Sequence, residues 1–243
     1  MDKRELFEKS LNTEPAFQEY EMDQLSMIGD FIGRHPKFFK KVYKAYKSDE
    51  ESVNYEPDTG APVSVIFDQE LKQVVINRLK VEITFTEGQF LKFMELIDLC
   101  YSLIIPLGSV VSLDTDMMPE SLKARTGDTN QDIHVMIIAQ KIPLRESLEG
   151  FYADYMAALW PFGAQEQIMP IMVSGIMIKA VVHKGMTNEV EQEYKSKLKS
   201  TIAAGVLRSI TYVTEDDMKK LEAAFATKIE AEIASEAKVG GVS

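Results

Sequence analysis

The chain has 243 residues, of which 45% are apolar and 27% charged, and its formal net charge is -11. This length can bury a sizeable core in one large domain or two small ones. The negative charge argues against a nucleic-acid-binding protein, because such proteins normally carry a basic face. The one short basic stretch that could form such a patch spans residues 37–41.

The chain shows no signal for export or for a membrane span. Its N-terminus lacks the apolar core of a signal peptide, and no stretch approaches the roughly 18 uncharged apolar residues that cross a bilayer. The nearest candidate, residues 169–182, contains Pro170 and Lys179. The single cysteine, Cys100, lies in an apolar run and is expected to be a buried thiol. We therefore expect a cytoplasmic protein.

The first 47 residues are expected to form helices, with a break at Pro36. Apolar and aromatic residues recur at helical spacing on both sides of this break. Lysines follow among the aromatic residues, which indicates an amphipathic helix with a solvated basic face. A helix that docks an acidic partner is the alternative. Residues 48–62 are polar and contain proline and glycine, so they predict a loop and a boundary.

Strand patterns follow over residues 63–68, 71–76 and 79–86. The third run alternates strictly between apolar and polar residues, which is typical of a half-buried strand. The connections are too short for parallel crossovers, so the three runs predict an antiparallel meander. Thr86 and Gln89 have the spacing of a capping box, which starts a helix that ends before Pro106.

The second half predicts strands over residues 108–113, 133–141, 152–160, 172–182 and 210–213, and a helix over 188–204. A C-terminal helix is expected from Thr214, with one narrow apolar seam: Met218, Leu221, Phe225, Ile229 and Ile233. The fold class is therefore α+β, with antiparallel sheets, N-terminal helices, a central helix and a long C-terminal helix. The expected units are a helical segment (1–50), a meander plus helix (63–104), a β-rich domain (105–213) and a C-terminal helix and tail (214–243).

No motif for catalysis stands out. The three histidines (His35, His134 and His183) lack the spacing of metal ligands, and neither a serine-nucleophile elbow nor a phosphate-binding loop is present. The polar excursion over residues 114–132 carries the acidic residues Asp114, Asp116, Glu120, Asp128 and Asp132, which could hold a cation only if folding gathers them. We expect no enzyme, no cofactor and no metal, and keep an enzyme with a site in this acidic loop as an alternative.

Four segments of the second half resemble, in order, a known family, the domain of unknown function 4176. They are residues 105–113, residues 135–140, Asp154-Tyr155 leading to Trp160-Pro161-Phe162-Gly163, and residues 178–182 followed by Gly185. The resemblance covers roughly residues 103–198. It implies a small cytoplasmic companion of LXG-type toxins in type VII secretion loci of Gram-positive bacteria, acting as a chaperone or targeting factor before export.

The leading hypothesis is therefore a protein that binds a secreted toxin. Its interface should use aromatic anchors and adaptable methionines, because such residues carry much of the energy of protein interfaces. The candidate partner-binding residues are Trp160, Phe162, Tyr155, Phe38, Phe39, Tyr43, Met117 and Met118. An immunity protein that neutralises its cognate toxin is the alternative, since an acidic surface suits a basic nuclease site. The oligomeric state stays open.

Overall fold

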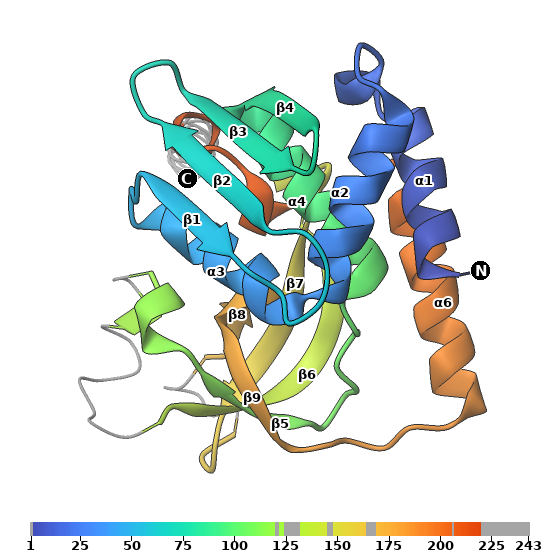
Figure 1. Ribbon diagram of the computed structural model, residues 1–243. Coiled ribbons are helices and arrows are strands. Elements are labelled where there is room, and N and C mark those ends of the chain that lie inside the picture. The colour runs from blue at the N-terminus through green and yellow to red at the C-terminus, as the bar shows by residue number, and fades with distance from the viewer. Residues whose placement is uncertain are drawn as a thin grey trace, which may run out of the picture.

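A computed structural model describes residues 2–119, 122–123, 132–144, 148–163, 169–205 and 207–219. The described residues form two lobes that pack against each other (Figure 1). The N-terminal lobe runs from the first helix to Tyr101, and the C-terminal lobe follows from Ser102. Each lobe combines helices with a mainly antiparallel sheet, so the expected α+β class is confirmed.

The N-terminal lobe begins with three helices: α1 (Lys3–Thr13), α2 (Met22–Arg34) and α3 (Pro36–Lys47). A short 3-10 turn, Pro15–Phe17, joins the first two. Pro36 occupies the first turn of α3, where its missing N–H has no helical partner to lose. The expectation of helices broken at Pro36 is confirmed.

The sheet of the N-terminal lobe has four antiparallel strands in the order β1 (Ser52–Tyr55), β2 (Val63–Asp68), β3 (Gln73–Arg78) and β4 (Val81–Thr86). The meander of the last three is confirmed. The prediction that residues 48–62 are entirely a loop is wrong, because β1 pairs with β2. This four-residue strand buries only Val53, so it lacks the alternation that would reveal it.

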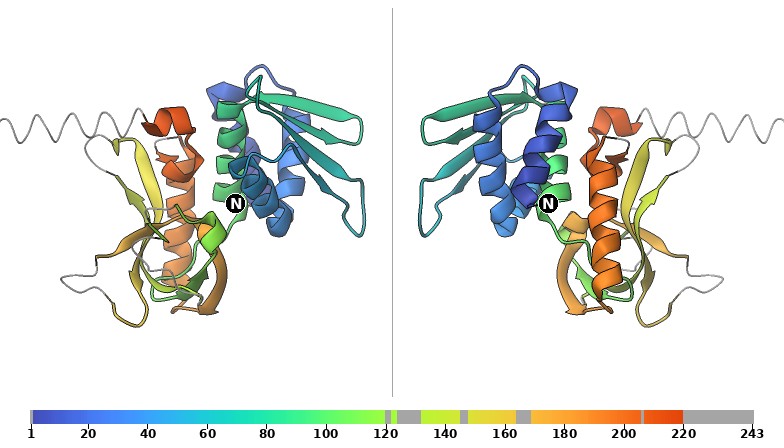
Figure 2. Two further views of the ribbon diagram at one scale, coloured as in Figure 1. Left: turned by 90° about the vertical axis from the view of Figure 1, so that its left-hand side faces the viewer. Right: turned by 90° about the vertical axis from the view of Figure 1, so that its right-hand side faces the viewer.

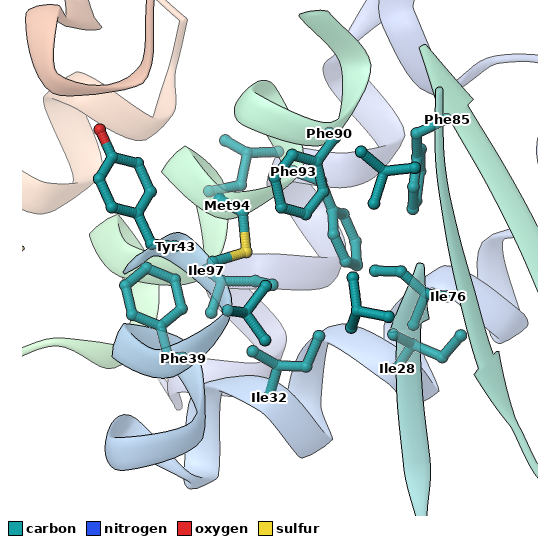
Figure 3. Packing of buried hydrophobic residues seen from close by; sticks show 14 of the residues in the cluster. Ile28, Ile32, Phe39, Tyr43, Ile76, Phe85, Phe90, Phe93, Met94 and Ile97 are labelled. Atoms are coloured by element: carbon teal, nitrogen blue, oxygen red, sulfur yellow. The ribbon is translucent and has the colours of Figure 1, made fainter. Parts of the chain in front are cut away.

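Helix α4 (Glu87–Tyr101) is the centre of the molecule. It starts at the predicted capping box, in which Thr86 accepts from the Gln89 amide and the Gln89 side chain accepts from the Thr86 amide. Most of its residues are buried, because sheet and helices of its own lobe cover one side and the C-terminal lobe covers the other. Figure 3 shows side chains of α2, α3 and α4 meeting those of β3 and β4 in one core.

Residues 1–50 and 63–104, expected as separate segments, contribute to this single core. Two glycines of α2 permit the close approach of the helices. A Cβ atom on Gly29 would lie 2.3 Å from the Phe7 ring, and one on Gly33 would lie 2.3 Å from the Tyr101 ring. The N-terminal lobe is therefore one closely packed unit in which the helices cannot be separated from the sheet.

The C-terminal lobe is built on a second sheet, whose strands are β5 (Val110–Leu113), β6 (His134–Pro143), β7 (Phe151–Leu159), β8 (Ile171–Val173), β9 (Ile178–His183) and β10 (Arg208–Ser209). The order is β10-β7-β6-β5-β9, and β8 pairs with another part of β7. Every pairing is antiparallel except that of β10 with β7. Helix α6 (Glu189–Ala203) follows β9 and lies alongside α4 and α1 (Figure 2).

Two details of the second half were predicted wrongly. Residues 172–182 do not form one strand: β8 and β9 are separated by a 3-10 turn, Gly175–Met177. Residues 210–213 are not a strand, because Ile210–Tyr212 is also a 3-10 turn. Of the expected C-terminal helix, residues 215–219 are helical, and the apolar seam from Leu221 onward lies outside the described residues.

The lobes share a buried interface. Ile176 and Tyr212 of the C-terminal lobe belong to the core of the N-terminal lobe. Tyr212 packs edge-on against Tyr43 of α3 at 5.4 Å between ring centroids, and the Tyr43 hydroxyl donates to the Thr211 carbonyl oxygen at 2.7 Å.

In the described part of the chain, no helix combines the length and apolar character needed to span a bilayer.

Candidate partner-binding surface

The structure separates the predicted partner-binding residues by exposure. Five of them are at most 5% exposed and pack inside the molecule: Phe38, Phe39, Tyr43, Tyr155 and Met118. Phe38 stacks on Tyr55 at 4.7 Å, and the Tyr155 hydroxyl accepts from the Ile105 amide at 3.1 Å. These side chains stabilise the fold of the chain itself, and Phe39, Tyr43 and Tyr155 also contribute to the walls of two pockets.

Trp160 and Phe162 are the predicted aromatic residues that do lie at the surface, with 53% and 60% exposure. They occupy the turn that follows β7, where the Trp160–Pro161 peptide bond is cis. The turn is tethered at both ends, since the Trp160 amide donates to the His134 carbonyl at 3.0 Å and the Gly163 amide to the Leu159 carbonyl at 2.8 Å. Gly163 takes a positive φ of 72°, which favours glycine.

Methionines line the sheet face that leads to this turn. Met156 of β7 is paired with Met172 of β8, and Met136 of β6 is paired with Ala158. Paired residues share a face, and Trp160 continues the same alternation along β7. Met172 is 53% exposed. We call Met136, Met156, Met172, Trp160 and Phe162 the methionine–aromatic surface.

Met117 lies at a pocket of about 600 Å³ beside that surface. Its lining includes three further methionines, Met172, Met177 and Met218. Methionine is flexible and polarisable, which suits surfaces that adapt to a partner. Met117 is half-buried and also packs against the core of the N-terminal lobe, whereas Met118 beside it is 4% exposed and belongs to the core of the C-terminal lobe.

The acidic residues of the 114–132 excursion do not come together where the structure describes them. The Asp114 side chain accepts from the Asp116 amide, Asp116 pairs with Lys44 of α3 at 2.7 Å, and Asp132 pairs with Lys179 of β9 at 2.9 Å. Within the described ranges, no three histidine, cysteine or acidic side chains form a group that could hold a metal ion. Glu120 and Asp128 lie outside those ranges.

A groove of about 820 Å³ runs between the two lobes. Its walls are the junction of α2 and α3, the end of α4, and residues 178–181 of β9. Cations dominate its charged lining: Lys3, Arg34, Lys40, Lys141, Lys179 and Lys199, against Asp2 and Asp98. Three of these cations pair with acidic side chains outside the lining: Arg34 with Asp30, Lys141 with Asp154 and Lys179 with Asp132. The other three, Lys3, Lys40 and Lys199, donate to backbone carbonyls.

Three lysines that line the groove donate hydrogen bonds to backbone carbonyl oxygens. Lys40 donates to the Ile178 carbonyl of β9. Lys3 donates to the Tyr101 carbonyl at 2.8 Å, and Lys199 donates to that of Ser102, so both neutralise the negative end of α4. Burial lowers the pKa of Lys40 and lowers that of Lys199 to about 8. Of these bonds, the one from Lys40 to Ile178 connects the two lobes.

A buried ion pair lies at the inner end of the groove. Lys141 of β6 pairs with Asp154 of β7 at 2.8 Å, and the two side chains are 7% and 1% exposed. Asp154 also accepts from the Gly175 amide at 2.9 Å and from the Thr211 hydroxyl at 3.2 Å. Burial acts to lower the pKa of Lys141, but Asp154 and neighbouring groups outweigh it and raise that pKa. The network joins four segments of the C-terminal lobe.

Sequence reasoning missed this network and the position of β9. The five residues of β9 after Ile178 are all exposed, although they include Val181 and Val182. The run Ile-Lys-Ala-Val-Val-His looks like a buried strand because it is apolar. Its lysine and histidine were the available signal, since natural edge strands often carry charged residues.

The residues of the C-terminal lobe match a known family. The family described as Domain of unknown function (DUF4176) matches residues 104–194. This segment, less than half of the chain, is similar to that family. It includes β5 to β9 and the start of α6, and hence the methionine–aromatic surface, while the groove also takes one wall from the N-terminal lobe. No curated protein matches the chain, and no solved structure matches it.

Proposed function

We propose that this chain is a cytoplasmic accessory factor that binds another protein through its DUF4176-like segment. The observation that carries the proposal is the exposure of Trp160 and Phe162 on a tethered turn that follows β7, the strand whose Met156 is paired with the exposed Met172. Large aromatic side chains held in place lose little conformational entropy on binding, which makes them effective anchors. Such residues are costly to expose without a partner when they gather in one patch.

The proposed partner is a secreted toxin of the LXG type, delivered to a type VII secretion system with this chain as its chaperone or targeting factor. This identity derives from the resemblance of the DUF4176 segment to companions of such toxins. The surface supports a binding role of this kind because its methionines can adapt to an apolar segment of the partner.

Co-expression with the toxin encoded beside this chain tests the proposal. The wild-type pair should co-purify and elute together in size-exclusion chromatography. A Trp160→Ser/Phe162→Ser variant should lose the complex, since hot-spot side chains each contribute about 2 kcal/mol or more. Leu71→Ser, which removes a 66% exposed leucine from the N-terminal lobe, is the matched control and should keep it. Elution of only free proteins from the wild-type pair would refute the proposal.

An immunity protein is the second candidate, favoured by the net charge of -11. The two roles differ in outcome when the toxin is expressed in the cytoplasm. An immunity protein restores growth of the toxin-expressing cells, whereas a chaperone or targeting factor changes only how much toxin is secreted. The expectation that the chain is not an enzyme remains a prediction, which an activity screen with Asp114→Asn and Asp116→Asn controls would test.

A further inference from the structure

The sheet of the C-terminal lobe ends in an open strand. Among the described residues, β9 has β5 as its one strand neighbour, so its other edge has no strand beside it. Val181 and Val182 are 48% and 58% exposed although their side chains point to opposite faces of the strand. An exposed apolar edge of this kind is a template for a further strand.

This open edge faces the groove between the lobes. Residues 178–181 all line the groove, and consecutive residues of a strand point to alternate faces. Four consecutive lining residues therefore indicate that the groove runs along the edge of β9, not over one face of it. An extended segment entering the groove would lie parallel to the edge, within reach of its backbone groups.

The charged side chains near the open edge of β9 indicate which kind of segment it would bind. Lys40 lines the groove opposite β9 and donates to the Ile178 carbonyl, and Lys184 follows the strand. Arg34 and Lys179 also line the groove but are paired with Asp30 and Asp132. A second copy of this chain would bring its own lysines against these cations, which disfavours pairing of β9 with itself. A segment rich in Asp and Glu would instead be attracted to this region.

We infer that the edge of β9 binds an acidic, extended segment of a partner protein by strand addition, with the acidic side chains facing the lysines of the groove. This inference rests on the proposed protein-binding function and specifies how part of the partner is held. Backbone hydrogen bonds to β9 would supply affinity, and alternate side chains of the added strand would supply specificity. The methionine–aromatic surface would contact a different, apolar part of the same partner.

Synthetic peptides test the mode of binding directly. A short peptide of alternating Glu and Val should bind the full chain, slow hydrogen exchange of the amides in residues 178–183 and shift their NMR signals. The same peptide with methylated backbone nitrogens lacks the hydrogen-bond donors and should not bind. A Lys–Val peptide should bind at least about tenfold more weakly, because its positive charges are repelled by the lysines of the groove. Equal binding of the Glu and Lys peptides, or protection elsewhere in the chain, would overturn the inference.

Reversing the charge of two lysines on and beside β9 is the second test of the inference. Lys179→Glu/Lys184→Glu should weaken binding of the Glu–Val peptide about tenfold or more. Lys80→Glu, an exposed lysine in the turn between β3 and β4, is the matched control and should leave binding unchanged. Circular dichroism and thermal melting verify that each variant folds.

The complex with the toxin separates this inference from the proposed function. If the wild-type complex forms and Lys179→Glu/Lys184→Glu leaves its Kd unchanged, strand addition at β9 is wrong while the binding function stands. If no wild-type complex forms with the toxin, the proposed function fails whatever the peptides show. A wild-type chain that is dimeric in solution, with the β9 amides already protected from exchange, would identify a second copy as the occupant and overturn the inference.

Discussion

The buried pair of Lys141 and Asp154 allows a quantitative test of the packing of the C-terminal lobe. Lys141→Met removes the cation but keeps the length of the side chain. It also keeps an ordinary L-residue at a position where φ is 45°, so the change in backbone strain is small. Asp154 would remain almost fully buried, bound to the Gly175 amide and the Thr211 hydroxyl without a cation.

The expected loss follows from the cost of an uncompensated buried charge. Removing one partner of a buried pair destabilises a protein by about 3–5 kcal/mol. The loss of the contact between the Lys141 ammonium and the Tyr152 ring, 4.9 Å away, adds to this. At about 2–4 °C per kcal/mol for a chain of this size, the Tm should fall by roughly 6–20 °C. The Lys141 pKa is raised, so this contribution is complete below the unfolded-state pKa of about 10.4 and disappears only as the pH rises through the folded-state pKa.

Urea unfolding followed by circular dichroism measures the effect, with Lys80→Met as the control on an exposed lysine. The double variant Lys141→Met/Asp154→Leu tests the reasoning further. It removes both charges and leaves the Gly175 amide and the Thr211 hydroxyl without their acceptor, at about 1–3 kcal/mol each. Its destabilisation should therefore fall clearly short of the sum of the two single variants. A loss below about 1 kcal/mol for Lys141→Met, or strict additivity, would refute the idea that the pair is a coupled buried unit.

Three further outcomes follow from the structure. Cys100 is 1% exposed, and burial raises its thiol pKa to about 11. At pH 8 a thiol reagent should therefore label Cys100 only when urea unfolds the chain. Labelling of the folded chain at the rate of a free thiol would contradict this. Burial raises the pKa of Asp98, so the ionised carboxylate destabilises the folded chain at neutral pH. Asp98→Asn should therefore raise the Tm at pH 7. This gain should shrink as the pH falls through the raised pKa towards the unfolded-state value of about 3.9. Gly33→Ala should cost about 1–3 kcal/mol in urea unfolding, because its Cβ would lie 2.3 Å from the Tyr101 ring, whereas Gly88→Ala, which meets nothing within 4 Å, should not.

Local patterns predicted most elements of the fold. The Thr86–Gln89 capping box and the alternation that ends in Ile83 and Phe85 both depend on neighbours within a few residues, and both are present in the structure. The predictions that failed depend on distant partners. Residues 172–182 are mostly apolar, and the 3-10 turn between β8 and β9 is held by the Gly175 amide bonded to Asp154, which is far away in sequence.

The buried aromatic candidates illustrate the same limit for the site. Helical spacing correctly placed Phe38, Phe39 and Tyr43 on the apolar side of α3. Periodicity cannot say what covers that side, and here the sheet of the N-terminal lobe and Tyr212 of the C-terminal lobe do so. Trp160 and Phe162 remained as candidates because the turn after β7 points away from both cores.

The two lobes differ in how many large apolar side chains they expose. In the described part of the N-terminal lobe, the large apolar side chains at the surface lie in turns or on the outer side of the sheet: Ile66, Leu71 and Leu79. The C-terminal lobe exposes more of them, along the turn after β7, before and on β8, and on β9, and also after α4, on β6 and around α6: Leu103, Leu107, Ile138, Trp160, Phe162, Met169, Met172, Val181, Val182, Met186, Val190 and Tyr194. Its inner face is already filled by its own core, so these residues are not an unfinished part of that core. Since Tyr212 and the bond from Lys40 to Ile178 anchor the lobe to the N-terminal lobe, the exposed surface is held on a packed support, as the proposed binding function would require.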